Sequence, residues 1–110
     1  MLRTGEGLVA LIPLCDTVAV EPGAALRVDA AERLFAVFNI DGQFYVTDDT
    51  CSHGPGSLSA GFIEGDVVEC DFHGGCFHIP TGQPVKAPCT EPVRVFPVTV
   101  RDGKIWIDAP

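Results

Sequence analysis

"CSHGPGSLSAGFIEGDVVECDFH", residues 51–73, contains a cysteine–histidine pair twice and no lysine or arginine. The first pair is Cys51 and His53, and the second is Cys70 and His73, with sixteen residues between the pairs. Glycines follow each pair, and glycine lets a backbone turn closely around a ligand because it has no Cβ and tolerates positive φ. Thiolates and imidazoles arranged in this way predict a metal site.

Three kinds of site use cysteine and histidine together. Structural zinc sites usually pair like with like, as Cys-x2-4-Cys and His-x3-5-His, whereas both pairs here are mixed. A catalytic cysteine with a histidine base would use one pair and leave the other without a role. A [2Fe–2S] cluster in which two histidines replace two cysteines on one iron uses all four residues. The spacing therefore favours the iron–sulfur site over the other two.

The composition of this 110-residue chain predicts one globular domain, because hydrophobic residues make up 46 % and charged residues 20 %. The formal net charge is -8, so we expect the chain to bind neither nucleic acid nor anionic membranes and to prefer a basic protein partner. No basic residue lies between Arg33 and Lys86, an interval that contains several acidic ones. We expect these to form either a solvated surface or a docking face; they are Asp41, Asp48, Asp49, Glu64, Asp66, Glu69 and Asp71.

Whether the five cysteines stay reduced depends on the cellular compartment, which the sequence helps to predict. The N-terminal residues 1–7 lack a signal-peptide pattern, and no apolar run reaches membrane-spanning length. We therefore expect a soluble, monomeric cytoplasmic protein whose cysteines stay reduced and are available to bind metal.

Short hydrophobic runs separated by turn residues predict an all-β domain. Asp-Gly turns at 41–42 and 102–103 predict two hairpins, and Pro97 predicts an edge or a bulge. The continuous run 34–40 is expected to be buried on both faces, and the stretch after Gly54 has room for one helical turn at most. The expected strands are 8–14, 25–28, 34–40, 44–46, 66–70, 93–100 and 104–107.

These strands suggest how the single domain 1–110 is organised. We expect residues 1–47 and 89–110 to form a β base, and residues 48–88 to form a loop-rich insertion that carries the Cys/His pairs. Glycine and proline are frequent on both sides of each pair, as a loop-rich segment requires.

The sequences Cys-Ser-His-Gly at 51–54 and Cys-Asp-Phe-His-Gly at 70–74 resemble the two cluster-binding boxes of Rieske proteins. The likeness covers nearly the whole chain, and it is greatest to the small ferredoxins of bacterial aromatic-ring-hydroxylating dioxygenase systems. It implies the Rieske fold of three stacked antiparallel β-sheets, with one [2Fe–2S] cluster at the tip of the insertion. By the same resemblance the buried iron is held by Cys51 and Cys70, and the outer iron by His53 and His73.

The resemblance also implies a function. Such a protein is a one-electron carrier between an NAD(P)H-dependent ferredoxin reductase and a terminal oxygenase, and it is not itself an enzyme. The sequence agrees, since it has no Gly-x-Gly-x-x-Gly fingerprint and only three histidines, two of which the boxes use. The alternative is a small Rieske subunit bound permanently in a larger redox enzyme, such as an assimilatory nitrite reductase.

Two departures from the high-potential Rieske proteins predict a low reduction potential. Those proteins brace their loops with a disulfide, but the matching positions here are Gly56 and Phe72. They also place hydroxyl donors near the sulfurs, where this chain has Gly75 and Phe77. Because each missing donor destabilises the more negative reduced state, we expect a potential of about −150 mV, at the low end of the Rieske range.

The other candidate residues are expected to be structural. Cys15 and Cys89 are predicted to be buried, reduced thiols, and Cys76 has no place in the ligand pattern. His78 is predicted to be a surface or strand histidine. The aromatic residues expected in the core, rather than in an electron path, are Trp106 and most of Phe35, Phe38, Phe44 and Phe96.

Overall fold

The computed structural model describes residues 10–51, 56–71, 74–87 and 90–109. These residues form β-strands and two short 3₁₀ helices, η1 (Thr17–Ala19) and η2 (Leu58–Ala60), so the all-β prediction is confirmed. The strands are β1 (Ala10–Asp16), β2 (Ala25–Ala30), β3 (Arg33–Ile40), β4 (Gln43–Asp48), β5 (Phe62–Glu64), β6 (Val67–Glu69), β7 (Cys76–His78), β8 (Pro84–Lys86), β9 (Val95–Phe96), β10 (Val98–Arg101) and β11 (Lys104–Ala109).

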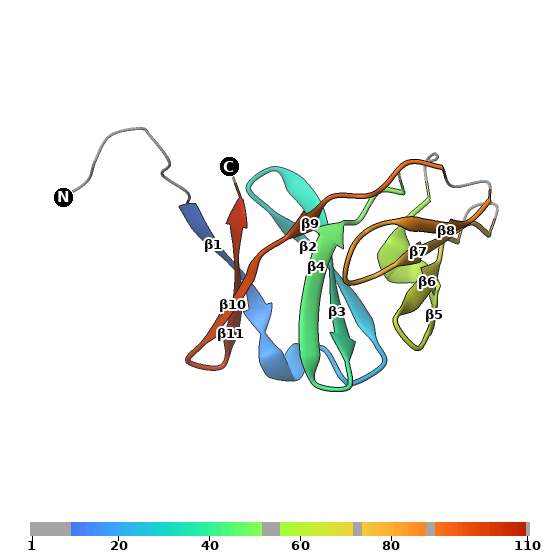
Figure 1. The fold of residues 1–110 in the computed structure, drawn as a ribbon. Helices are drawn as coiled ribbons and strands as arrows, with labels where there is room; N and C mark the ends of the chain where they lie inside the picture. The colour runs from blue at the N-terminus through green and yellow to red at the C-terminus, as the bar shows by residue number, and fades with distance from the viewer. Residues whose placement is uncertain (1–9, 52–55, 72–73, 88–89, 110) are drawn as a thin grey trace.

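The strands form three antiparallel sheets, as expected. The terminal sheet has the order β1-β11-β10, the central sheet β2-β3-β4-β9 and the third sheet β5-β6-β7-β8. In Figure 1 the terminal sheet lies on the left, the central sheet in the middle and the third sheet on the right. The central sheet therefore has a hydrophobic core on each side.

Strand β3 supplies side chains to both cores. Residues 35–38 are all 0 % exposed, which confirms the expectation that this strand is buried on both faces. Because alternate side chains of a strand point to opposite faces, Phe35 and Val37 pack toward the terminal sheet, while Ala36 and Phe38 pack toward the third sheet. The core on the terminal side is Val20, Phe35, Val37, Val46, Phe96, Ile105 and Ile107.

Both predicted Asp-Gly hairpins are present. Asp41 and Gly42 have φ of 54° and 90°, and Asp102 and Gly103 have φ of 55° and 73°. Positive φ at both central residues is the type I′ pattern, whose twist matches that of the paired strands. These turns join β3 to β4 and β10 to β11.

A third hairpin joins β2 to β3 through a turn that the sequence did not predict. Its central residues, Ala31 and Glu32, have φ of 51° and 63°. Neither is a usual residue for a left-handed conformation, which costs a side chain with a Cβ about 1–2 kcal/mol. The six paired residues on each strand keep this hairpin in register.

The predicted strand 93–100 is wrong as a single element. Val95 and Phe96 form β9 of the central sheet, whereas Val98 begins β10 of the terminal sheet. Pro97 lies between them and has no N–H to continue a ladder. The proline therefore marks the point where the chain passes from one sheet to the next, and is neither an edge nor a bulge within a hairpin.

The third sheet is a meander of four strands, each only three residues long. Of these strands, only β6 lies within a predicted one, 66–70. The helical turn expected after Gly54 is η2, which directly precedes β5. The sheet lies across a second core from the central sheet; this core is Ala36, Phe38, Cys51, Leu58, Val68, Cys70, Phe77, Ile79 and Val93.

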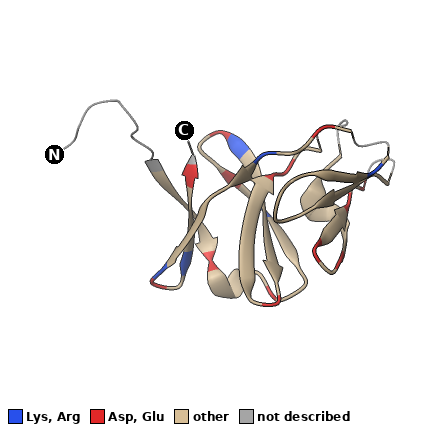
Figure 2. Cartoon of the chain, in the orientation of Figure 1, with Lys and Arg blue, Asp and Glu red and all other residues tan. Residues whose placement is uncertain are grey.

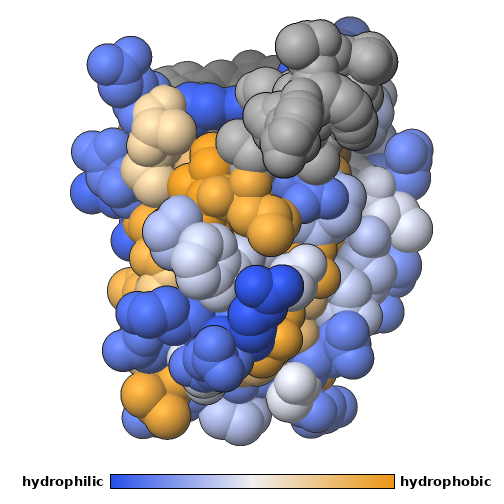
Figure 3. Space-filling model, turned by 90° about the vertical axis from the view of Figure 1, so that its left-hand side faces the viewer, coloured by the Kyte–Doolittle hydropathy of each residue, from blue (hydrophilic) through white to orange (hydrophobic). Residues whose placement is uncertain are grey.

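The side of the molecule formed by the terminal sheet faces the viewer in Figure 3. Apolar surface is visible there in patches, with hydrophilic side chains around and between them. Leu11 of β1 and Val100 of β10 are the large hydrophobic residues exposed on this sheet's described part. Among the described residues, no helix has the length and apolar character to span a membrane.

Candidate metal centre

Both cysteines of the predicted site lie at the start of a tight loop that closes in the same way. The Cys51 N–H donates to the Gly56 carbonyl (2.9 Å), and the Cys70 N–H donates to the Gly75 carbonyl (2.7 Å). In each case the acceptor is a buried glycine five residues later. Cys51 follows β4, and Cys70 directly follows β6. The backbone thus forms two matched loops, each anchored at its cysteine.

The first loop is anchored to the core by a buried carboxylate. Asp49 is only 2 % exposed and accepts hydrogen bonds from the Ser57 hydroxyl (2.7 Å) and the Ser59 N–H (2.8 Å). Its carbonyl accepts from the Leu58 N–H (2.7 Å), and Thr50 and Ser57 form an isolated β-bridge. Asp49 therefore fixes the return of the first loop into η2.

The two cysteines are buried among apolar side chains. Cys51 is 3 % and Cys70 is 2 % exposed, and both belong to the core between the central and third sheets. Phe77, which has no hydroxyl, is fully buried in the same core. The described side chains of this core exclude water and, being apolar, offer no hydroxyl or amide donor to a bound anionic group.

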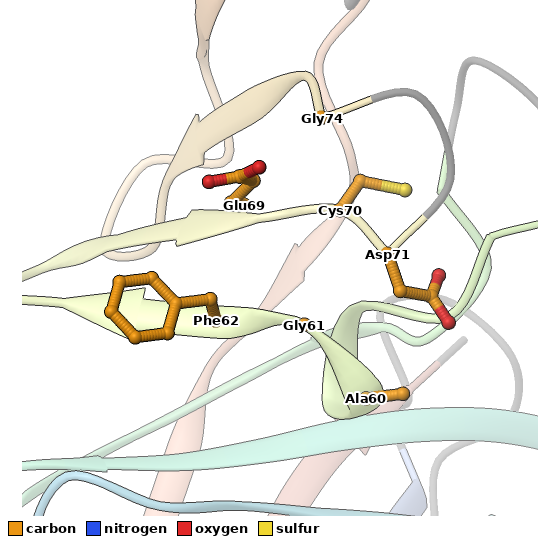
Figure 4. Close-up of a pocket in the computed structure, with 7 residues that line it drawn as sticks. All are labelled: Ala60, Gly61, Phe62, Glu69, Cys70, Asp71 and Gly74. Atoms are coloured by element: carbon orange, nitrogen blue, oxygen red, sulfur yellow. The ribbon is translucent and has the colours of Figure 1, made fainter.

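A pocket of about 420 Å³ opens beside Cys70. Figure 4 shows the Cys70 side chain on one wall, with Phe62 and Glu69 on the neighbouring strands and Asp71 beyond. Phe62 is 64 % exposed. The complete lining is Ala60, Gly61, Phe62, Glu69, Cys70, Asp71 and Gly74.

Gly61 and Gly74 allow two segments to approach each other near Cys70. A Cβ on Gly61 would collide with the backbone carbonyl of Glu69, the residue before Cys70. Gly74 has φ of 75°, and a Cβ there would lie 3.2 Å from a Glu69 carboxylate oxygen. Both glycines are needed for the backbone geometry next to the second cysteine.

The described part of the site fits an iron–sulfur group. Two cysteines lie at the bases of two matched loops in a core from which water is excluded, and thiolates are the usual ligands of iron in such groups. The two predicted histidine ligands, His53 and His73, lie outside the described residues. Within residues 10–51, 56–71, 74–87 and 90–109, no group of three or more metal-binding side chains occurs.

Acidic side chains gather beside the third sheet. Figure 2 shows them at the turn between β5 and β6, where Glu64 and Asp66 lie. The Asp66 carboxylate accepts a hydrogen bond from His78 Nε2 (3.0 Å), and His78 Nδ1 lies 2.9 Å from the Thr81 hydroxyl. His78 is thus a strand histidine with both ring nitrogens engaged, as predicted.

The remaining cysteines have structural surroundings. Burial is the largest cause that raises the pKa of the Cys76 thiol; Lys86 opposes this shift and Glu69 adds to it. Cys15 was expected to be buried but is only half-buried, because a register shift follows Pro13 in β1. Burial, followed by the charge of Asp16, raises the pKa of Cys15. Cys89 lies outside the described residues.

Sequence reasoning missed the roles of two carboxylates. Asp49 and Asp71 were counted only as acidic surface residues, yet Asp49 is buried and Asp71 accepts a hydrogen bond from the Ser57 N–H (2.8 Å). Their position was the available signal, because each lies within two residues of a candidate cysteine.

Comparison with known proteins identifies relatives that match most of the chain. A family model described as "Rieske [2Fe-2S] domain" matches residues 10–97. The chain is 43% identical over 97 residues to the ferredoxin CarAc of Metapseudomonas resinovorans, covering 87% of this chain and 91% of that protein. It is 41% identical over 95 residues to the biphenyl dioxygenase ferredoxin subunit of Pseudomonas sp. strain KKS102, covering 86% and 87%.

A solved structure of a ferredoxin in complex with an oxygenase also matches this chain. It is a complex of reduced oxygenase and oxidised ferredoxin in carbazole 1,9a-dioxygenase. One of its chains matches with a TM-score of 0.84 and 42% identity, covering 89% of this chain and 92% of that chain. The predicted Rieske fold is thereby confirmed, and these relatives are named as ferredoxin components rather than as catalytic subunits.

Proposed function

The chain belongs to the Rieske [2Fe–2S] family, and we propose that within it the protein is the soluble, cytoplasmic electron carrier of an aromatic-ring-hydroxylating dioxygenase system. Membership implies one Rieske [2Fe–2S] cluster as the cofactor. When bound, such a cluster takes up and gives up one electron at a time. The single observation that carries the proposal is the pair of matched cysteine loops in a chain so similar to named ferredoxins.

We propose that Cys51 and Cys70 hold the buried iron, and that His53 and His73 hold the outer iron. The burial of both cysteines at the loop bases supports their part of this assignment. The histidine part rests on the spacing of the two boxes, since each histidine follows its cysteine within three residues. The division into a base of 1–47 and 89–110 and an insertion of 48–88 stays a prediction.

The surrounding residues would keep water from the thiolates and favour the less negative, oxidised state. Leu58, Val68 and Phe77 are all buried with the two cysteines. Phe77 and Gly75 offer no hydroxyl, and the Cys70 N–H already donates to the Gly75 carbonyl. Fewer donors destabilise the reduced state, which supports a potential of about −150 mV, near the low end for this class.

The proposed partners are an NAD(P)H-dependent ferredoxin reductase and a terminal oxygenase. The solved structure from carbazole 1,9a-dioxygenase is a complex of a ferredoxin with its oxygenase. A carrier must dock briefly, and surface charges steer such encounters. Glu64 is exposed at the β5–β6 turn and suits this role; Asp66 is a poorer probe because it also contacts His78.

Charge reversal tests the steering. Glu64→Lys should slow reduction by the reductase at low salt and have less effect at high salt, because salt screens exposed charges. Asp29→Lys, which makes the same charge change on β2 of the central sheet, is the matched control. Stopped-flow reduction rates at two ionic strengths measure both. Equal rates for the two variants at low salt would rule out a role for the acidic turn.

Electron paramagnetic resonance of the dithionite-reduced protein tests the cofactor and its ligands. A rhombic [2Fe–2S] signal with an average g below that of all-cysteine clusters is expected for histidine ligation. A silent sample that contains zinc would contradict the proposal. His73→Cys adds negative charge and should lower the potential if the group is retained; an unchanged or higher potential would contradict the assignment of His73.

Purification tests the carrier role itself. A monomer that speeds electron flow from an NAD(P)H-dependent reductase to an oxygenase is expected. Purification in a fixed ratio with a large redox enzyme would instead support the alternative of a permanently bound subunit, as in an assimilatory nitrite reductase.

A further inference from the structure

The two cysteine loops are joined directly by a hydrogen bond from Ser57 to Asp71. The Ser57 N–H donates to Asp71 Oδ1 at 2.8 Å. Ser57 is the residue after Gly56, which closes the first loop, and Asp71 is the residue after Cys70, which opens the second. In Figure 4 the Asp71 carboxylate points away from Glu69, toward the segment that contains η2. This bond therefore spans the two loops close to both proposed thiolate ligands.

Ser57 is itself fixed from the opposite side. Its hydroxyl donates to Asp49 Oδ2 at 2.7 Å and lies 3.1 Å from the Ser59 hydroxyl. Asp49 is buried, so this end of the network cannot move without disturbing the core. Asp71 thus connects the second loop to a rigid point beneath the first.

We propose that Asp71 is a positioning residue that fastens the second ligand loop to the first and, through its charge, disfavours the reduced state of the bound cluster. The inference rests on the ligand set proposed above. In Rieske proteins with the inter-loop disulfide a covalent bond joins the loops; this chain has Gly56 at one matching position and cannot form it. A hydrogen bond to a carboxylate is among the stronger noncovalent replacements.

The charge of Asp71 acts separately from its hydrogen bond. Asp71 is one residue from Cys70 and two residues from His73, within an interval that has no basic side chain. An added electron makes the bound group more negative, so a nearby carboxylate opposes reduction. Charge and hydrogen bond can therefore be removed one at a time.

Three variants of the holoprotein separate the two effects. Asp71→Asn keeps an oxygen acceptor for the Ser57 N–H but removes the charge. Asp71→Ala removes both, and Asp71→Glu keeps the charge but displaces the carboxylate. Glu64→Gln is the control, because it removes one exposed charge at the end of β5, away from the two cysteines in the sequence. The readouts are the reduction potential, the g values of the reduced protein and the rate of iron release to a chelator.

We expect Asp71→Asn to keep the wild-type g values and iron-release rate. Its equilibrium constant for reduction should rise roughly threefold to tenfold, as expected for losing an exposed charge that lies next to a proposed ligand. Asp71→Ala should show the same rise, altered g values and iron release faster by about tenfold, since a charge-assisted hydrogen bond is also lost. Glu64→Gln should change the equilibrium constant by less than about twofold, because its exposed charge lies at the β5–β6 turn and not next to a proposed ligand.

Each result bears on a different claim. Iron release and g values in Asp71→Ala equal to those of Asp71→Asn would overturn the positioning role. An Asp71→Asn potential equal to that of Glu64→Gln would overturn the charge effect. If Asp71→Ala retains no iron, the positioning role is tested with Asp71→Glu instead. Wild-type g values and a wild-type iron-release rate in Asp71→Glu would overturn that role. A wild-type protein without the rhombic signal would count against the proposed function itself.

Discussion

The central sheet and the third sheet share a core but are stabilised differently. The hairpin strands of the central sheet, β2 to β4, are six to eight residues long and pair over their full lengths. Every strand of the third sheet has three residues. Short strands bring few ladder hydrogen bonds and little apolar area of their own.

The third sheet depends instead on contacts made by its loops. The matched closures at Cys51 and Cys70, the Asp49 network and the close approach at Gly61 hold it in place. Its core includes the two proposed thiolate ligands, so a bound metal group would join its two loops from inside. We therefore expect the central and terminal sheets to fold by packing, and the third sheet to depend on its cofactor for stability.

Of all the tests, removal of iron should give the largest difference in amide-exchange protection between the third sheet and the other two sheets. Because metal-binding energy contributes to folding, chelation should abolish slow amide exchange in β5 to β8. The central and terminal sheets should keep protection in β3, β4 and β11. Hydrogen exchange of holoprotein and chelated protein measures this. Equal loss of protection in all three sheets would contradict the expectation that only the third sheet depends on the cofactor.

Two phenylalanines on β3 offer the next test, since they face opposite cores. Phe35 packs edge-to-face on Phe96, with ring centroids 5.2 Å apart, while Phe38 packs with the two cysteines. Both Phe35→Ala and Phe38→Ala should lower the free energy of unfolding by about 3–5 kcal/mol, because each leaves a cavity in a dense core.

Only Phe38→Ala should also speed iron release. Chemical denaturation and chelator assays on both variants separate a general loss of stability from a local effect at the metal centre. If Phe35→Ala released iron equally fast, the two cores would act as one cooperative unit.

The same contrast explains which parts of the fold were predictable. The Asp-Gly hairpins and the doubly buried strand β3 follow from local signals: turn residues that tolerate positive φ, and an uninterrupted apolar run. Strands β5, β7 and β8 are too short to show periodicity, and they pair because the loops place them side by side. Pro97 was recognised as a breaker, but only the tertiary fold decides which sheet each flanking strand joins.

The sequence predicts the chemistry of the site but not its supports. The structure places both cysteines at loop bases, and the role of these cysteines and of the two histidines as ligands stays a prediction. Asp49 and Asp71 resemble any other carboxylates of an acidic surface, because hydrogen bonds between distant loops leave no spacing pattern in the sequence. Their roles became visible only when the two loops were placed together.

Gly61→Ala should disturb the third sheet through the backbone alone. The added methyl group would collide with the Glu69 carbonyl, and overpacking of this kind costs about 1–3 kcal/mol. Because Glu69 precedes Cys70, iron release should also become faster. Gly65→Ala is the control: Gly65 has positive φ but open space around it, so backbone strain is introduced away from the loop. Iron release equally fast in both variants would contradict a specific role for the close approach.

The smallest expected effect is a gain in stability in the central sheet. Among the residues that the structure describes, three hairpins use turns with two positive φ values. Of these, only the turn between β2 and β3 places a residue other than glycine at its second position, Glu32 (φ 63°). Glu32→Gly should therefore raise the free energy of unfolding by about 1 kcal/mol, since glycine adopts this conformation without steric cost.

The hairpin between β3 and β4 provides the reverse experiment. Gly42 has φ of 90° and open space around it, so Gly42→Ala should cost a similar amount, about 1 kcal/mol, through backbone conformation alone. Denaturant unfolding of the two variants measures both changes. The reduction potential of each should equal that of the wild type, because neither turn belongs to the core that contains the two cysteines. A loss of stability in Glu32→Gly would mean that the paired strands, rather than the turn, determine the free energy of this hairpin. The long strands of the central sheet would then tolerate turn strain that the three-residue strands of the third sheet could not.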